Sequence, residues 1–478
     1  MNFLGVAHET WILVSVAVCL AYVAGQYVFG MMTMIVSVWE HRERTQQDRA
    51  ENYDSLIRSR FTIPVSILAA AYNEEAAVVP SAQSLLAQTH PEFEVIIVND
   101  GSTDGTLKVL RREFDLEPRH VFYRRTLESA PVRGVYRSLT DPRLTVIDKE
   151  NGGKADALNC GFNFARYRYL CCVDGDTVYA RDAVLKGMRP AQNDPAHVVG
   201  VASFLGVAQQ PSLGKERRRF GSRPRHLDPS TFMNFQHLDL MRSFLLHRLA
   251  WSRLGAMMCV PGGFALWRRD VIAETGGFSK RFSCEDIEMT FRVHERNRTA
   301  KHAYRILSLP EPVAETEGPQ RVGDLVKQRA RWQRVLAETV WHYRHMVFRA
   351  GQGVVGWLAL PYLVLYEAVA PIFQVVSFAA FAIVVALGLL EWRAQIYFFG
   401  LLIFANALPV SVSVAMHDQT YRDFRLRDVI KLVLLGPLDL LVYRPILLVA
   451  GMRGTWDFLR GKKGWDKFKR NASAACTS

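Results

Sequence analysis

Long apolar runs at both ends of the chain predict membrane helices. Residues 11–38 contain no charged side chain, and a helix needs about 20 apolar residues to cross a bilayer. We expect a retained transmembrane helix here, because the run has no basic leading segment and is too long for the apolar part of a signal peptide. Arg42, Arg44 and Arg49 follow the run, which predicts that its C-terminal end faces the cytoplasm.

Three further apolar runs occupy residues 354–390, 396–416 and 429–449. The first could form two spans, or one interfacial helix and one span, so we expect three to four C-terminal spans. The arginines between residues 422 and 427 and the basic C-terminal tail both favour the cytoplasmic side. They can share it if 429–449, which Pro437 and Pro445 interrupt, is re-entrant or interfacial.

Polar residues inside these apolar runs are candidates for function. Glu367, Asn406 and Asp439 are such positions, and intramembrane polar groups often belong to a substrate path. For Asn406, a hydrogen bond that packs two helices together is an equally good interpretation.

Short apolar runs alternate with helical patterns in the middle of the chain. Strands are predicted over 64–73, 93–105 and 169–176, helices over 76–88 and 105–114, and a strand, glycine loop and helix over 144–165. Continuous apolar strands between helices indicate a parallel sheet covered on both faces. The basic stretch 215–230 has no such pattern, and we expect a loop there.

These patterns together predict an α/β domain inserted between membrane helices. The expected organisation is an N-terminal transmembrane helix (1–40), a cytoplasmic linker (41–61), the α/β domain (62–345), C-terminal transmembrane or interfacial helices (346–452) and a basic cytoplasmic tail (453–478).

The charge and the cysteines narrow the class of function. The formal net charge of +13 is compatible with nucleic acid, anionic lipid or phosphate-bearing substrates. Many basic residues flank apolar segments, at 39–44 and 460–470, which favours a membrane surface, and we expect no nucleic-acid partner. None of the seven cysteines forms a C-x-x-C pair, so a zinc site or disulfide framework is not expected.

Polar clusters stand where the predicted strands end. They are "YNEE" at 72–75, "NDGS" at 99–102 and "DGD" at 174–176, and ligands of parallel α/β sheets bind at the carboxyl ends of the strands. Asp174 and Asp176, separated by Gly175, could both face a divalent cation, which prefers oxygen ligands. An ordinary Asp-Gly turn is the alternative.

The other candidates each have a functional and an ordinary interpretation. Asp100 could accept a hydrogen bond from a nucleobase or simply cap a turn or helix. Lys154, after two glycines, could meet phosphate or base oxygens or be a solvated surface lysine. Glu285 and Asp286 could include a general base or only complement a helix dipole.

The segment "KQRARWQR" at 327–334 has two interpretations as well. It could be a basic amphipathic helix at the bilayer surface. Alternatively, Gln328 and Arg331 could bind a diphosphate leaving group, and Trp332 could stack on a sugar.

The order of the motifs resembles a known family. The segments "AAAYNEE", "VIIVNDGSTDGT", "NGGKADALNCG", "CVDGDT", "PGGFALWRRDV", "SCEDIEMTFRV" and "QRARW" resemble the membrane-integrated family 2 glycosyltransferases. That group includes the synthases of cellulose, chitin, hyaluronan and poly-N-acetylglucosamine. The resemblance spans roughly residues 64–335 and the flanking helices. It implies a GT-A (Rossmann-like) catalytic domain, cytosolic here, that uses a nucleotide-diphosphate sugar and Mg²⁺ or Mn²⁺.

The resemblance also implies roles for single residues. Tyr72, Glu74 and Asp100 would hold the nucleoside, and Lys154 and Asp174 the nucleotide. Asp174 and Asp176 would bind the metal, and Gln328 and Arg331 the diphosphate. Gly262, Gly263, Phe264 and Trp332 would lie beside the acceptor. The catalytic residues would be Asp286 and Glu285, with Asp286 as the general base. One position departs from the family: Cys284 stands where many relatives have threonine.

The expected function is an inverting, processive transferase. It would polymerise a UDP-activated sugar, with N-acetylglucosamine favoured, into a β-linked polysaccharide at the cytoplasmic face of a bacterial inner membrane. We expect three partners: the UDP-sugar donor, the growing polysaccharide and membrane lipids. An accessory subunit could be a fourth. The alternatives are a non-processive enzyme that adds one sugar to a lipid carrier and a catalytically silent partner subunit.

Overall fold

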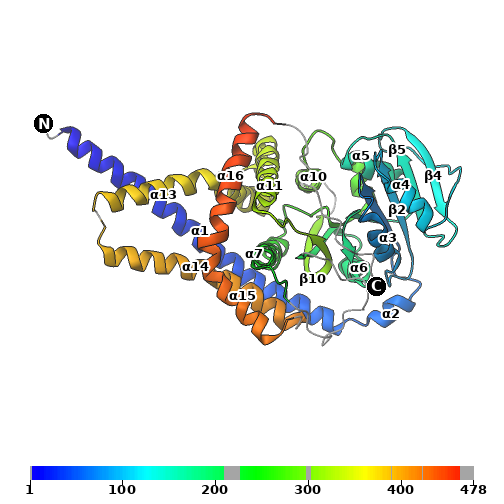
Figure 1. The fold of residues 1–478 in the computed structure, drawn as a ribbon, viewed down its shortest axis with the longest axis horizontal. Helices are drawn as coiled ribbons and strands as arrows, with labels where there is room; N and C mark the ends of the chain where they lie inside the picture. Colours follow the sequence, from blue (N-terminus) through cyan, green and yellow to red (C-terminus); the bar gives the residue numbers. More distant parts are fainter. Residues whose placement is uncertain (1–2, 209–226, 298–302, 389, 422–423, 463–478) are drawn as a thin grey trace.

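The computed structural model describes residues 3–208, 227–297, 303–388, 390–421 and 424–462. Figure 1 shows an α/β domain on the right and long helices that extend away from it on the left. Most of the stretch 215–230, where we predicted a loop, lies outside the described residues, and so does the predicted tail beyond residue 462. The structure therefore does not test either prediction.

The centre of the α/β domain is a ten-stranded mixed sheet with the strand order β3-β4-β5-β2-β1-β6-β9-β8-β10-β7. The strands are β1 (Val65–Ala71), β2 (Phe93–Asp100), β3 (Leu116–Pro118), β4 (Val132–Ser138), β5 (Leu144–Lys149), β6 (Tyr169–Asp174), β7 (Val178–Tyr179), β8 (Val198–Ala208), β9 (Phe264–Arg268) and β10 (Arg305–Glu317).

The predicted α/β class is confirmed, but the sheet is not entirely parallel. Strands β5, β2, β1 and β6 run parallel to one another. In contrast, β9 lies antiparallel between β6 and β8, and β4 pairs antiparallel with β5. An apolar run does not encode strand direction, because a strand covered on both faces has the same composition in either orientation.

Helices cover both faces of the sheet. Every residue of β2 is buried, and its alternate side chains enter two cores: Val95 packs on one face and Ile96 on the other. One face is covered by α3 (Val78–Leu86), α4 (Thr106–Glu113) and α6 (Ala183–Asn193), and the other by α5 (Lys154–Phe164), α9 (Arg269–Glu274) and α10 (Glu285–Asn297).

A second group of helices joins the sheet to the apolar part of the molecule. The long helix α11 packs along α16, and the continuous run of α7, η1 and α8 contacts α1 and β8. The helices of this group are α7 (Thr231–Met241), η1 (a π-helical turn, Arg242–Arg248), α8 (Leu249–Arg253) and α11 (Val322–His342). Two short helices, α2 (Tyr53–Arg58) and η2 (a 3₁₀ turn, Arg344–Met346), follow α1 and α11 along the chain.

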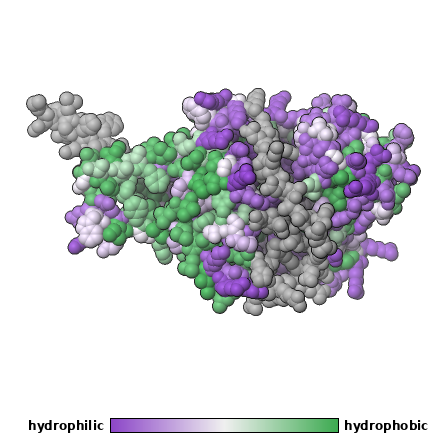
Figure 2. Space-filling model, in the orientation of Figure 1, coloured by the Kyte–Doolittle hydropathy of each residue, from purple (hydrophilic) through white to green (hydrophobic). Residues whose placement is uncertain are grey.

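The long helices form the apolar side of the molecule, which Figure 2 shows as a continuous green surface beside the more polar α/β domain. They are α1 (Phe3–Ala50), η3 (Val355–Ala359), α12 (Leu360–Leu363), η4 (Val364–Ala368), α13 (Ala370–Ala386), α14 (Trp392–Tyr421), α15 (Leu426–Leu438), η5 (Asp439–Tyr443) and α16 (Arg444–Leu459).

Within the described residues, three helical segments are long and apolar enough to cross a membrane: Ala17–Ala50, Trp392–Tyr421 and Leu426–Leu459. A fourth would be the pair Val355–Ala368 and Ala370–Ala386, which is bent by 53°. On these criteria the C-terminal region contributes two candidates, or three with the bent pair, which is at or below the low end of the predicted three to four.

Candidate active site

A cavity of about 3010 Å³ opens at the carboxyl ends of the central strands and continues between the long helices. Its lining includes nearly every residue that the sequence singled out: Tyr72, Glu74, Asp100, Lys154, Asp174, Asp176, Gly262, Gly263, Glu285, Asp286, Gln328, Arg331 and Trp332. Asp439 and Phe264 do not line it. Phe264 was predicted to border the acceptor. It begins β9, its side chain is fully buried in the core, and its ring lies near that of Tyr179.

Lys154 lies between two acidic side chains that come from other elements. Its Nζ is 2.7 Å from Oδ1 of Asp174, the last residue of β6, and 3.0 Å from Oε1 of Glu285, the first residue of α10. Burial lowers the pKa of Lys154, but Asp174, Glu285 and Asp286 outweigh it and hold that pKa well above its usual range. A fixed cation therefore stands at the edge of the sheet, where a diphosphate could replace a carboxylate as its partner.

Glu285 lines the cavity, but its carboxylate is engaged by Lys154. Its side chain is almost completely buried, and burial raises its pKa, although Lys154 opposes that effect. The geometry makes Glu285 the partner of Lys154 and leaves the neighbouring Asp286 as the carboxylate exposed to the cavity.

Three short hydrogen bonds orient the carboxylate of Asp286. Oδ2 accepts from the backbone N–H of Gly262 at 2.9 Å, and Oδ1 accepts from the N–H of Ile287 at 2.6 Å and from Sγ of Cys284 at 2.9 Å. Burial raises the pKa of the Cys284 thiol, so this group remains protonated and able to donate. A Cβ at position 262 would lie 2.7 Å from Nζ of Lys154, so any larger residue there would displace the end of that lysine.

Asp100 organises the glycine loop that precedes Lys154. Its carboxylate accepts hydrogen bonds from the N–H groups of Gly152 and Gly153 at 3.0 and 2.8 Å. Gly153 has a φ of +87°, a conformation that other residues rarely adopt. Asp100 therefore holds the loop, and it also lines the cavity where a nucleoside contact was predicted.

Buried ion pairs behind this loop were not predicted from the sequence. Lys149 is completely buried and lies 2.5 Å from Asp100 and 2.7 Å from Asp156. Asp156 also pairs with Lys280. A lysine at the end of the apolar strand β5 was the available signal, since an ionised group in that environment needs partners.

Asp174 and Asp176 fit a divalent cation only with additional ligands. Both line the cavity, but Oδ1 of Asp174 already contacts Lys154, and Oδ1 of Asp176 accepts from the hydroxyl of Thr177 at 3.2 Å. In the described part of the chain, no group of three or more His, Cys, Asp or Glu side chains could hold a metal. Two carboxylates together with substrate diphosphate oxygens would suit Mg²⁺ or Mn²⁺.

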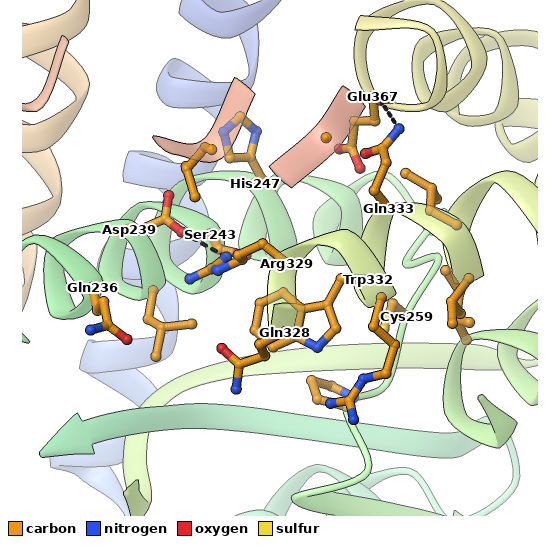
Figure 3. Close-up of a pocket in the computed structure, with 18 of the residues that line it drawn as sticks. Gln236, Asp239, Ser243, His247, Cys259, Gln328, Arg329, Trp332, Gln333 and Glu367 are labelled. Carbon is orange, nitrogen blue, oxygen red and sulfur yellow. Dashed lines mark hydrogen bonds and ion pairs between the residues drawn. The ribbon is translucent and has the colours of Figure 1, made fainter. Parts of the chain in front are cut away.

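Two of the three predicted α11 residues are labelled in Figure 3, which shows Gln328 and Trp332 on the side of α11 that faces the cavity. The Trp332 side chain is 43% exposed. Burial lowers the pKa of Arg331, while Cys284, Asp174 and Asp286 raise it, so its guanidinium lies in the field of the Asp174 and Asp286 carboxylates. One helix thus brings an amide, a cation and an indole to the same cavity.

Beyond Trp332 the cavity has a polar part that sequence reasoning mostly missed. Figure 3 shows Asp239, Ser243 and His247 from α7 and η1 around it, and Glu367 next to Gln333. The amide of Gln333 donates to the main-chain oxygens of Glu367 at 3.2 Å and Ala368 at 2.8 Å. Of these residues the sequence had pointed only to Glu367, as an acidic residue in an apolar run.

Comparison with known proteins identifies the domain. Residues 66–274 match the model of glycosyl transferase family 2, and residues 222–407 match that of glycosyl transferase family group 2. Among solved structures, a mannosyltransferase from Pyrobaculum calidifontis, in complex with GDP-Man and Mn²⁺, aligns with a TM-score of 0.51 and 17% identity, over 94% of this chain and 100% of that one. This likeness concerns the fold.

Curated relatives include two poly-β-1,6-N-acetyl-D-glucosamine synthases from Staphylococcus epidermidis. One is 28% identical over 56% of this chain and 53% of its own length, and the other is 25% identical over 73% and 72%. The chain therefore spans about half the length of the first of them. The matched domains and the GT-A fold confirm the resemblance seen in the motifs, and residues 66–274 form a family 2 glycosyltransferase domain.

Proposed function

We propose that the protein is an inverting, processive glycosyltransferase that polymerises a UDP-activated sugar into a β-linked polysaccharide. The observation that carries this proposal is a single cavity that joins Asp286, the Lys154–Asp174 pair and the Trp332 indole, and then continues between the long apolar helices. The names of the staphylococcal relatives favour N-acetylglucosamine as the sugar.

In the proposed reaction, Asp286 is the general base. An acceptor hydroxyl attacks the anomeric carbon from the face opposite the leaving group, and its proton passes to the Asp286 carboxylate. The bond between the anomeric carbon and the diphosphate oxygen breaks, UDP leaves with that electron pair, and the configuration inverts. The hydrogen bonds from Gly262 and Ile287 keep the carboxylate oriented during the transfer.

Positive groups stabilise the leaving diphosphate. Lys154 and Arg331 lie close to Asp174 and would turn from it to the phosphate oxygens. Asp174 and Asp176 would hold Mg²⁺ or Mn²⁺, which would neutralise charge on the diphosphate. Gln328 would hydrogen-bond the same group, Tyr72 and Glu74 would contact the nucleoside, and Gly263 would border the acceptor.

The membrane part completes the proposal. Residues 62–345 would lie at the cytoplasmic face of a bacterial inner membrane, as the positive charge after α1 indicates. We propose the other domain limits as the sequence predicts them: an N-terminal transmembrane helix (1–40), a linker (41–61), C-terminal transmembrane or interfacial helices (346–452) and a basic tail (453–478). The product would leave past Trp332 and the polar residues between the long helices, with Gln374 and Asn406 among those lining the cavity.

A second candidate function rests on the far end of the cavity. There the lining becomes strongly apolar, with Phe378, Phe381, Phe398, Phe399 and Leu402. Such a lining suits an acyl or polyprenyl chain better than a polysaccharide. Transfer of a single sugar to a lipid carrier is therefore the alternative.

The test uses the full chain in lipid nanodiscs with a panel of UDP-sugars and either Mn²⁺ or Mg²⁺. UDP release is measured, and the product is extracted and digested with linkage-specific glycosidases. Polymer supports the proposal, a single-sugar lipid supports the alternative, and no UDP release from any sugar supports a silent subunit.

Substitution of the proposed general base, Asp286, tests the proposed mechanism. Asp286→Asn should lower the transfer rate by about 10²–10⁴-fold and leave UDP binding unchanged, because the amide keeps the size of the side chain. Asp324→Asn, which removes an exposed ion pair of α11, serves as the matched control and should behave as wild type. Loss of UDP binding in folded Asp286→Asn protein would contradict the role of Asp286.

A further inference from the structure

A chain of ion pairs runs from the acceptor side of the cavity into the last apolar helical segment. Arg329 of α11 is 2.8 Å from Asp239 of α7, Asp239 is 2.6 Å from Arg242 of η1, and Arg242 is 3.2 Å from Asp439 of η5. Asp439 also accepts hydrogen bonds from Arg444 at 3.1 Å and from Asn406 at 3.2 Å. These ion pairs connect α11, the continuous helix formed by α7 and η1, and the turn η5.

These groups are buried far more than surface ion pairs. The side chains of Asp239 and Arg242 are 12% and 8% exposed, and that of Asp439 is 1% exposed. Burial raises the pKa of Asp239, but Arg329, Arg242 and Arg444 bring it to about 2, so it is ionised at any physiological pH. Buried ion pairs add little net stability compared with apolar residues, which favours a role in positioning.

The free end of the chain lies against Trp332. The Arg329 guanidinium carbon is 4.3 Å from the centroid of the Trp332 ring, a distance at which a cation is attracted to the face of an indole. Figure 3 shows Arg329 between Asp239 and Trp332, with the dashed line marking its ion pair. The guanidinium also donates a hydrogen bond to the Tyr443 hydroxyl at 3.4 Å, so it contacts a carboxylate, a hydroxyl and an aromatic ring.

The two inner members stand at irregular turns. Arg242 is the first residue of the π-helical turn η1, and Asp439 is the first residue of the π-helical turn η5. Such turns are often found at functional sites, because the extra residue redirects the helix face. Here the ion pair of Arg242 with Asp439 joins the two turns directly.

We propose that Asp239 is a positioning residue that holds Arg329 against Trp332, and that this contact sets the plane of the indole for the acceptor sugar. The proposal rests on the acceptor role of Trp332 in the proposed function. Without the Asp239 carboxylate, Arg329 leaves the ring face, and the half-exposed indole loses its fixed orientation. Donor binding, which depends on the strand ends, is left intact.

The experiment measures kcat/KM for an oligosaccharide acceptor and KM for the UDP-sugar in full-length protein in nanodiscs. Asp239→Asn and Arg329→Lys should each lower acceptor kcat/KM about tenfold and leave donor KM unchanged. Asparagine no longer holds the guanidinium on the ring, and the single ammonium of lysine cannot both pair with Asp239 and stack flat on the indole. Arg329→Lys keeps the positive charge beside Asp239, so it preserves folding if Asp239→Asn does not. Asp324→Asn is again the control on the same helix.

A double-mutant cycle separates positioning from a structural role. If Asp239 acts through the indole, Asp239→Asn should have no further effect on acceptor kcat/KM in the Trp332→Ala background. Equal losses in both backgrounds, or a parallel rise in donor KM, would overturn the proposal.

Electron cryomicroscopy of Arg329→Lys provides a readout that does not depend on the product. The Trp332 indole should be displaced or disordered, with Gln328 and Asp286 unmoved. An indole in its wild-type position would refute the positioning role even if the enzyme proved to use a lipid acceptor. A displaced indole in an enzyme that makes no polymer would instead support positioning and contradict the proposed polymerase.

Discussion

Gly454 of α16 packs closely against α11, the helix that carries Trp332. A Cβ added at this glycine would lie 2.3 Å from the main-chain oxygen of Ala330 and 2.6 Å from Cβ of Gln333, both on α11. Ordinary van der Waals contact begins at 3.4 Å. Since a backbone oxygen cannot rotate away, Gly454→Ala should push α11 and α16 apart by roughly 1 Å.

The stability and the activity should respond very differently. Overpacking lowers the free energy of unfolding by about 1–3 kcal/mol. The higher helix propensity of alanine compared with glycine raises it by about 1 kcal/mol. The net decrease should therefore be at most about 2 kcal/mol. A shift of about 1 Å in substrate-positioning groups can lower a rate by about 100-fold. We therefore expect a folded enzyme with a transfer rate at least tenfold lower.

The assay is UDP release in nanodiscs together with a thermal melt of the same sample. Gly400→Ala on α14 is the matched control, because a Cβ there has no atom within 4 Å, and it should leave both measurements close to wild type. Transfer by Gly454→Ala within twofold of wild type would refute the argument that this contact fixes the position of α11.

Two predictions concern the α/β domain away from α11. Lys149→Met should lower the free energy of unfolding by about 3–5 kcal/mol, measured by thermal or denaturant unfolding, because it leaves the buried Asp100 and Asp156 without their shared cation; unchanged stability would contradict this. Burial lowers the pKa of His90 to about 4, so the neutral ring contributes stability that is complete above pH 6.5 and is lost as the pH falls toward 4. His90→Gln should remove up to about 3 kcal/mol of this pH dependence, at about 1.4 kcal/mol per pKa unit, and an equally steep pH profile in the variant would show that other groups cause it.

The central strands and the site around them were predictable from the sequence because both depend on local pattern. Strands β1, β2 and β6 are short apolar runs whose ends carry the polar clusters, and parallel strands bring such ends to one edge. The structure accordingly gathers Lys154, Asp174 and Asp286 around one cavity. Their assigned roles remain proposals.

Contacts between distant parts of the chain were not predictable in the same way. The direction of β9 and the burial of Phe264 depend on where the chain re-enters the sheet, which an apolar run does not encode. Asp239 forms ion pairs with Arg329 of α11, which lies 90 positions further along the chain, and with Arg242 of η1, which lies 3 positions further. Asp439, an acid inside an apolar run, was the one member of that chain that the sequence marked as unusual.

The position of α11 ties the transfer site to the apolar helices at three points. Gly454 of α16 lies against its backbone at Ala330, Gln333 hydrogen-bonds the main chain at Glu367 and Ala368, immediately before α13, and Arg329 is connected through Asp239 and Arg242 to the last apolar segment. These contacts differ in kind, being steric, hydrogen-bonded and ionic, so no single change of pH or salt releases all of them. Since Gln328 and Trp332 lie on the same helix, any movement of the apolar helices that shifts α11 also moves the side chains proposed to hold the diphosphate and the acceptor. If Trp332 binds the acceptor as proposed, the apolar helices of this enzyme are part of its acceptor site, and not only an anchor for a catalytic domain.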